Sequence, residues 1–295
     1  MSGGRHPDVL VIGEALVDIV DTPGGRGEHV GGSPANVALG LGRRGVGVAL
    51  LTQFGDDERG RTIAQHLSHS GVDVLAESVR RGPTSTAWAR LAPDGQAEYD
   101  FDVSWGPVRH PAGLLPRVVH TGSIAVFLAP GGDSVRGVLH GSSAAEITFD
   151  PNIRPALVGP YDVAFRAFAE TAGLATVLKM SDQDAAWLYP DLPIDDVLQE
   201  LLLLGPRLVA VTLGSEGAII ANSEHRVWIP PVKVDAVDTI GAGDTFMASL
   251  IHSVLEHGSI GLDGHLLEEV GRQASKAAAI TVSRAGADLP WASEL

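Results

Sequence analysis

Short apolar runs alternate along this chain with segments whose apolar residues recur at helical spacing. The run 8–13 (DVLVIG) is continuously apolar, which is typical of a strand that is covered on both faces of a sheet. Further strands are expected at 46–55, 117–127, 146–152, 175–181 and 207–214. This strand–helix alternation predicts a parallel sheet wrapped by helices.

Helices are expected between these strands and at the end of the chain. In 33–45 (SPANVALGLGRRG), Ser33 is predicted to be the N-cap, Pro34 suits the first turn, and Gly45 ends the helix. The amphipathic segment 57–71 predicts the next helix. Two long helical patterns, 242–257 and 263–283, occupy the last third of the chain.

Two stretches depart from this rhythm, because apolar and polar residues alternate in 15–25 and 84–105. The second contains Pro93-Asp94-Gly95, a sequence suited to the turn of a hairpin. Alternation predicts strands with one solvated face. We expect a small antiparallel sheet outside the main one, acting as a lid formed by about 15–32 and 84–105; hairpin decoration without a function is the alternative.

Composition narrows the possible classes of protein. The chain has 295 residues, a hydrophobic share of 44%, and a net charge of −15. The acidic balance argues against a nucleic-acid or anionic-membrane partner, which clustered Lys and Arg would serve. The sequence contains no cysteine, which excludes thiolate catalysis and Cys-ligated zinc. We expect a cytoplasmic protein with no membrane span, because charged residues interrupt the apolar runs.

The segment 235–251 (DAVDTIGAGDTFMASLI) places small residues and an acid at the mouth of a helix. A helix N-terminus presents unpaired N–H groups and a partial positive charge. Gly241, Ala242 and Gly243 would let an anion approach those groups. Asp244, in the first turn, could accept a proton from a substrate hydroxyl. The alternative is a glycine turn with Asp244 as a simple cap.

Two motifs together resemble the signatures of the PfkB family of ribokinase-like carbohydrate kinases. They are 31–45 (GGSPANVALGLGRRG) and 238–244 (DTIGAGD), in that order and about two hundred residues apart. The resemblance extends over nearly the whole chain. It implies a single domain over 1–295, with a three-layer α/β/α core, a mostly parallel sheet and a small β-sheet lid.

The resemblance also implies roles for residues at the sugar site. Asp244 corresponds to the catalytic base, and Gly241, Ala242 and Gly243 to the anion hole. The sugar contacts implied are Asp18, Gly31, Gly32 and Asn36. Arg154, in 149–155 (FDPNIRP) with Asn152, corresponds to a residue near the transferred phosphate. Alternatives are a solvated strand residue for Asp18, a first-turn helix residue for Asn36, and an ion pair with a surface acid for Arg154.

Other motifs match the nucleotide half of the family's site. The implied nucleotide contacts are Lys179, Ser181, Thr212, Gly214, Gly217 and Ser275. For Lys179 a solvated strand end is the alternative, and for 211–218 a plain β-turn. In 178–190 (LKMSDQDAAWLYP), Ser181 and Asp184 stand where other members have Asn-x-x-Glu, so Asp184 is only a candidate Mg²⁺ ligand.

The resemblance also suggests a monovalent-cation site, with K⁺ as a candidate ion. Its ligands would be Asp238 and the backbone carbonyls of Ile240, Thr281, Arg284 and Gly286. A turn cap is the alternative role for Asp238. The small sheet would expose strand edges, which often pair, so a homodimer through the lid is a further expectation.

The sequence therefore predicts an ATP-dependent sugar kinase that uses Mg²⁺. The motifs GGSPANVA, FDPNIRP and KMSDQDAAWL are most similar to the fructokinase branch, which makes fructose the leading substrate. Ribose, 2-keto-3-deoxygluconate and a nucleoside are alternatives within the family. A catalytically inactive sugar- or nucleotide-binding regulatory protein is the alternative of another class.

Overall fold

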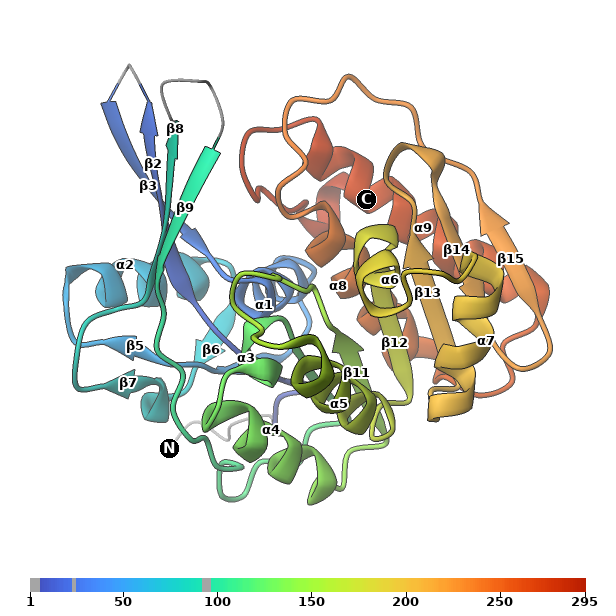
Figure 1. Cartoon of the computed structure of the whole chain (residues 1–295), viewed down its shortest axis with the longest axis horizontal. Helices are drawn as coiled ribbons and strands as arrows, with labels where there is room; N and C mark the ends of the chain where they lie inside the picture. Colours follow the sequence, from blue (N-terminus) through green and yellow to red (C-terminus); the bar gives the residue numbers. More distant parts are fainter. Residues whose placement is uncertain (1–5, 23–24, 92–96) are drawn as a thin grey trace.

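A nine-stranded sheet forms the centre of the molecule in the computed structural model, which describes residues 6–22, 25–91 and 97–295 (Figure 1). The strand order is β15-β14-β13-β12-β11-β10-β1-β4-β6, and neighbours pair in parallel except that β14 runs antiparallel to both β13 and β15. In chain order the strands are β1 (Val9–Ile12), β4 (Val48–Leu51), β6 (Val72–Val74), β10 (Val118–Gly122), β11 (Glu146–Asp150), β12 (Val177–Ser181), β13 (Leu208–Thr212), β14 (Ala218–Ala221) and β15 (Arg226–Ile229).

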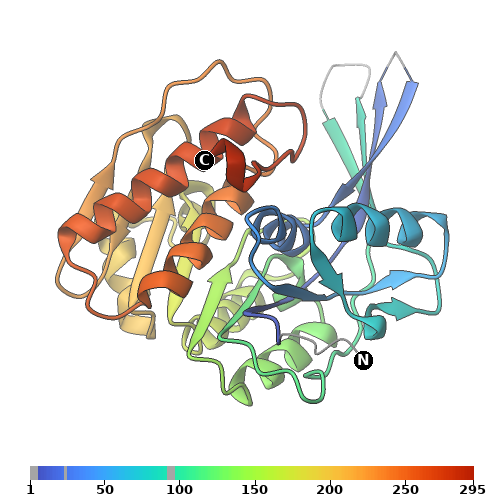
Figure 2. The same cartoon turned by 180° about the vertical axis from the view of Figure 1, so that it is seen from behind.

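Helices cover both faces of this sheet (Figures 1 and 2). On one face lie α1 (Ser33–Arg43), α2 (Glu58–His69), α8 (Ala242–His257) and α9 (Gly264–Val282). On the other lie α3 (Ile124–Phe127), α4 (Gly131–His140), α5 (Tyr161–Ala172), α6 (Asp182–Leu188) and α7 (Ile194–Leu204). Strand β1 is apolar throughout because both of its faces are covered. Val9 and Val11 pack against the α1, α2, α8 and α9 face, and Leu10 and Ile12 pack against the α3–α7 face. The predicted three-layer α/β/α core with a mostly parallel sheet is confirmed.

A separate four-stranded sheet projects from this core (Figure 1). Its order is β3 (Gly25–Gly31), β2 (Leu16–Thr22), β8 (Thr86–Leu91) and β9 (Ala97–Asp102). These strands fall within 15–32 and 84–105, the ranges expected for the small sheet, so that sheet is confirmed, although β2 and β8 pair in parallel. The turn expected at 93–95 lies outside the described residues. Strands β3 and β9 are the edges, and a dimer through them stays a prediction.

Local differences from the expected elements are few. Helix α1 has Gly32 as its N-cap, so the prediction that Ser33 is the cap is wrong. The strand expected at 117–127 ends at Gly122, after which the chain turns into α3. A two-stranded pairing joins β5 (Phe54–Gly55) and β7 (Val79–Arg80). Within the described residues, no helix is long and apolar enough to cross a membrane.

Candidate active site

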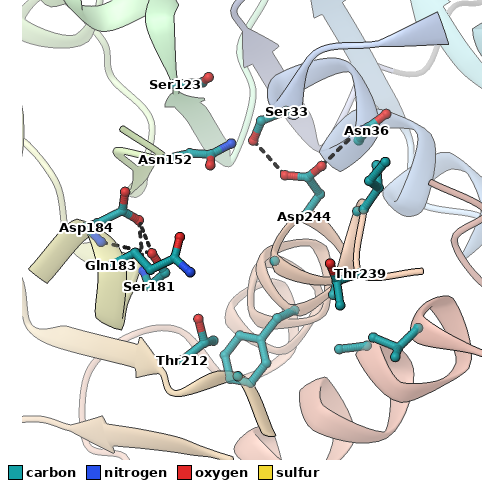
Figure 3. A pocket seen from close by; sticks show the side chains of 18 of the residues that line it. Ser33, Asn36, Ser123, Asn152, Ser181, Gln183, Asp184, Thr212, Thr239 and Asp244 are labelled. Atoms are coloured by element: carbon teal, nitrogen blue, oxygen red, sulfur yellow. Dashed lines mark hydrogen bonds between the residues drawn. The ribbon is translucent and has the colours of Figure 1, made fainter. Parts of the chain in front are cut away.

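A cavity of about 1150 Å³ opens at the carboxyl ends of the parallel strands, where open α/β sheets bind their ligands (Figure 3). Its wall comes from the ends of β1, β10, β11, β12 and β13, from the small sheet, and from the N-termini of α1 and α8. Most predicted site residues line it together: Asp18, Gly32, Asn36, Arg154, Lys179, Ser181, Asp184, Thr212, Gly214, Gly217, Ile240, Gly241, Ala242, Gly243, Asp244 and Ser275.

Asp244 lies in the first turn of α8 and is only 7% exposed. Its Oδ1 accepts a hydrogen bond from Ser33 Oγ at 2.7 Å, and its Oδ2 accepts one from Asn36 Nδ2 at 2.7 Å (Figure 3). Both donors belong to the first turn of α1, the segment that carries the first signature. The carboxylate therefore has a fixed orientation, as a proton acceptor for a bound hydroxyl requires.

Gly241, Ala242 and Gly243, at the N-terminus of α8, line the cavity, and the N–H of Ala242 donates a bond of 3.3 Å to the carbonyl oxygen of Thr239. Gly241 is the N-cap, with φ of 80°, and no side chain among the described residues caps this end. A Cβ at Gly241 would lie 2.9 Å from the Cβ of Ala287, so both conformation and space require glycine there. This uncapped helix end favours anion binding by Gly241, Ala242 and Gly243, which stays a prediction.

Asp18 projects from β2 into the other end of the cavity. Burial raises its pKa to about 6, while His29 and Arg154 partly oppose the shift. A Cβ at Gly31 would lie 2.0 Å from Asp18 Oδ2, so glycine at 31 makes room for this carboxylate. Gly31 does not line the cavity itself but leaves room for Asp18, which is half-buried in the cavity wall rather than fully solvated.

Gly32 joins β3 to α1 with φ of 103°, and a Cβ there would lie 2.5 Å from the carbonyl oxygen of Glu14. Such backbone freedom and close approach are available only to glycine. Gly32 therefore sets the direction in which α1 begins, and with it the positions of Ser33 and Asn36.

Lys179 is not a solvated strand end, and that alternative is wrong. Its side chain is 4% exposed, and its Nζ donates a hydrogen bond to Asp150 Oδ2 at 2.8 Å. Although burial opposes it, the carboxylate of Asp150 raises the pKa of Lys179. Lys179 nonetheless lines the cavity beside Gly243.

Ser181 and Asp184 form a capping box at the start of α6, in which each side chain bonds to the backbone of the other. Asp184 Oδ2 accepts bonds from the N–H and Oγ of Ser181, at 2.9 and 2.7 Å. Its Oδ1 accepts a bond from the N–H of Ile153 at 2.7 Å. The carboxylate thus ties the loop after β11 to α6. Its role as a Mg²⁺ ligand stays a prediction, since no group of three or more His, Cys, Asp or Glu in the described ranges could hold a metal ion.

Three predicted nucleotide contacts line the cavity at the end of β13: Thr212 is its last residue, and Gly214 and Gly217 follow it. Gly217 has φ of 98°, and a Cβ there would lie 2.1 Å from the carbonyl oxygen of Ile229, so the turn requires glycine. Ser275 reaches the same wall from α9.

The loop after β11 brings Asn152 and Arg154 to the cavity. Asn152 has φ of 37°, which is uncommon outside glycine and is found at ligand sites. Arg154 is exposed, and its Nη1 donates a bond to Asn152 Oδ1 at 2.8 Å. The alternative of an ion pair with a surface acid is therefore not what the structure shows.

The predicted cation ligands gather beside the cavity rather than in it, except for Ile240. Asp238 Oδ1 accepts a bond from the N–H of Ile240, and its Oδ2 from the N–H of Gly286, at 3.0 and 2.9 Å. Thr281 and Arg284 are joined by a backbone bond of 3.0 Å in the same turn. Asp238 therefore links the turn before α8 to the segment after α9. Cation binding by these residues stays a prediction.

Sequence reasoning missed Glu14, Ser33 and Ser123 in this cavity. Burial raises the pKa of Glu14 to about 7, partly offset by a hydrogen bond from Ser123, and Glu14 Oε2 accepts a bond from the N–H of Ala125. Ser123 has φ of 55°. Glu14 and Ser123 follow the ends of β1 and β10, and this position at the sheet's carboxyl edge is the signal that could have identified them.

Comparison with known proteins identifies the family. The model of the pfkB family carbohydrate kinases matches residues 6–294. The chain belongs to this family. Fructokinase-1 of Oryza sativa subsp. japonica is 32% identical to this pfkB member over 96% of the chain and 94% of the relative.

Two solved structures share the pfkB fold of this chain. A sugar kinase of Pyrococcus horikoshii in complex with ATP has a TM-score of 0.82 at 27% identity, covering 97% of this chain and 96% of that one. A fructokinase of Vibrio cholerae O395 with fructose, ADP and calcium bound has a TM-score of 0.80 at 25% identity, covering 96% and 94%. The predictions of the PfkB family, its ribokinase-like fold and a carbohydrate kinase activity are confirmed.

Proposed function

We propose that this pfkB family member is an ATP-dependent fructokinase with Asp244 as general base. One observation carries the proposal: Asp244 is oriented by Ser33 and Asn36 of α1 at the point where the N-terminus of α8 opens. A proton acceptor and an anion site thus meet in one cavity, as phosphoryl transfer to a hydroxyl requires.

The reaction follows from this arrangement. A sugar hydroxyl donates its proton to the carboxylate of Asp244, and its oxygen attacks the γ-phosphorus of ATP. A new phosphorus–oxygen bond forms, the bond to the β,γ-bridging oxygen breaks, and ADP leaves. The N–H groups at Gly241, Ala242 and Gly243 stabilise the charge on the transferred group. The small sheet closes over the sugar and excludes water, which limits ATP hydrolysis.

Magnesium would accompany the nucleotide. Mg²⁺ usually retains water and binds through one or two carboxylates plus phosphate oxygens, which suits a cavity without a cage of acidic ligands in its described part. The bonds to Ser181 and Ile153 already use most of the lone pairs of Asp184, which points to contact through water. When bound, the ion would offset phosphate charge.

Fructose as the acceptor is supported by the relatives. The rice relative is a fructokinase, and the similar Vibrio cholerae structure holds fructose and ADP. In this chain the sugar end of the cavity offers the carboxylates of Asp18 and Glu14 and the amides of Asn36 and Asn152. Such groups accept and donate bonds to several hydroxyls of one sugar.

A coupled assay of ADP release with Mg-ATP tests the proposal. Fructose, ribose, 2-keto-3-deoxygluconate and a set of nucleosides are compared at equal concentrations. We expect the highest kcat/KM with fructose. A higher value for another acceptor would reassign the substrate, and ATP binding without turnover of any acceptor would favour an inactive regulatory protein.

A further inference from the structure

A buried ion pair lies beneath the anion site of α8. Lys179 of β12 and Asp150 of β11 are 4% and 1% exposed, and their Nζ and Oδ2 atoms are 2.8 Å apart. Burying two charges is costly, and an apolar pair of similar size often stabilises a protein better. Stability alone therefore gives little reason for an ion pair at this point in the core.

The ammonium of Lys179 approaches the backbone of the anion site closely. A Cβ at Gly243 would lie 2.9 Å from Lys179 Nζ, and no other atom from outside this turn of α8 lies within 4 Å of it in the described part of the chain. Gly243 lies inside α8, in helical backbone that any residue can adopt. An alanine at 243 would therefore require the ammonium of Lys179 to move aside.

Charges around Lys179 leave it as the buried cation of the cavity. The carboxylates of Asp150, Asp184 and Asp244 all act on its ammonium. Of the described lining residues, Arg154 and Lys233 also carry positive charge, but both are exposed. A charge shielded from water stabilises a nearby anion more strongly than an exposed one.

The carboxylate of Asp150 has no other hydrogen bond within the described protein: Oδ2 accepts from Lys179, and Oδ1 is buried without a partner. The bond from Lys179 is therefore the one hydrogen bond that the Asp150 side chain makes within the described residues, and this bond fixes where the ammonium lies. Asp150 sits at the carboxyl end of β11, directly below the loop that carries Asn152.

We propose that Lys179 is the buried positive charge of the anion site, acting beneath Gly243 on the phosphoryl group during its transfer, and that Asp150 is its positioning residue. The inference rests on the proposed kinase function. It assigns Lys179 to the charge that develops during transfer, in addition to nucleotide contact. The competing explanation is that the pair only braces β11 against β12.

A double substitution separates the two explanations. Lys179→Met alone leaves the carboxyl of Asp150 buried without its partner, so the melting temperature of this variant should fall below that of the unchanged protein. Lys179→Met with Asp150→Leu removes both charges and should recover stability. We expect kcat with fructose and Mg-ATP to stay lowered about 100-fold in the double variant, because loss of one charge-stabilising group has that effect. Recovery of both stability and kcat would overturn the proposal.

A matched control removes an exposed ion pair instead. Arg226 and Asp195 form such a pair between β15 and α7, with side chains 48% and 61% exposed. The variant Arg226→Met with Asp195→Leu should keep the kcat of the unchanged protein.

Gly243→Ala offers a second test that does not remove the ion pair. The added methyl group should push the flexible end of Lys179 aside and lower kcat. If it acts through Lys179, adding Gly243→Ala to the double variant should lower kcat little further. Fully multiplicative losses would mean that the methyl group obstructs the phosphate directly, and would overturn the link.

Binding of ADP with aluminium fluoride keeps the inference testable independently of the sugar. Aluminium fluoride imitates the transferred phosphoryl group, and calorimetry measures how much it tightens ADP binding. The double variant should lose this gain, whatever happens to its affinity for ADP alone. An unchanged gain would overturn the role of Lys179, whereas a failure of the unchanged protein to phosphorylate sugars would count against the proposed function only.

Discussion

Ser33 Oγ donates a hydrogen bond of 2.7 Å to Asp244 Oδ1, although the two residues are 211 positions apart in the chain. Asn36 donates to the other carboxylate oxygen. The two signatures of the family therefore meet at a single carboxylate. Because both donors come from one helix turn, the position of α1 sets the orientation of the proposed base.

Asp244→Asn should abolish most of the turnover. The amide cannot accept the hydroxyl proton, and loss of a general base costs about 10²–10⁴-fold in rate. We expect kcat to fall by that amount and ATP affinity, measured by calorimetry, to stay nearly unchanged. Asp162→Asn is a matched control, since Asp162 is an exposed acid in the first turn of α5. A near-normal kcat for Asp244→Asn would remove Asp244 from the base role.

Ser33→Ala tests the orientation of Asp244. A hydrogen bond to a charged group contributes about 1.5–3 kcal/mol, so kcat should fall at least tenfold. The fold should be retained, because Ser33 is not the cap of α1. Kinetics at saturating ATP and sugar measure the effect, with Ser68→Ala on the exposed face of α2 as the control. Equal kcat values for both variants would show that Asn36 alone suffices.

The main features of the site could be predicted from local patterns. Helices expected at 242–257 and 263–283 are observed at Ala242–His257 and Gly264–Val282. Asp244 and Asn36 could be located because each lies in a motif with a glycine, Gly241 or Gly32, that the backbone geometry requires.

Contacts between distant segments could not be predicted in the same way. Ser33 is a residue type that suits an N-cap, and sequence alone favours that role. Its bond to Asp244 could not be predicted, because it depends on how α1 packs against α8. Lys179 lies in the middle of β12, and sequence alone allows it to be a solvated strand end until Asp150 on the neighbouring strand is placed beside it. The place of Glu14 after β1 could be read from the sequence, but its hydrogen bond from the N–H of Ala125, more than a hundred residues away, could not.

Sugar affinity should depend on the protonation of Asp18. Burial raises the pKa of Asp18 to about 6, so its carboxylate is ionised above that pH and protonated below it. The ionised form accepts hydroxyl hydrogen bonds, and kcat/KM for the sugar should therefore fall as the pH decreases through about 6. Leaving a hydroxyl unpaired costs about 1–3 kcal/mol, so Asp18→Asn should raise the sugar KM at pH 8.

The pH profile of Asp18→Asn tests whether Asp18 is the group that titrates. Asp18→Asn should lose the fall in kcat/KM near pH 6, while Asp102→Asn, an exposed acid on β9, should keep it. If the fall persists in Asp18→Asn, another group that faces the sugar titrates there.

Stability should decrease with pH because of Glu14. Burial raises the pKa of Glu14 from 4.5 to about 7, so the folded protein holds this proton more tightly than the unfolded chain does. The resulting stabilisation is complete below pH 4.5 and is lost as the pH rises to about 7, a change of about 3 kcal/mol from the size of the shift. Glu14→Gln stays neutral, so its advantage over the unchanged protein should grow between pH 5 and pH 8. Urea unfolding at both pH values measures this difference, with the exposed Glu77→Gln as the control. A constant difference between the two proteins would mean that Glu14 titrates alike in the folded and unfolded states.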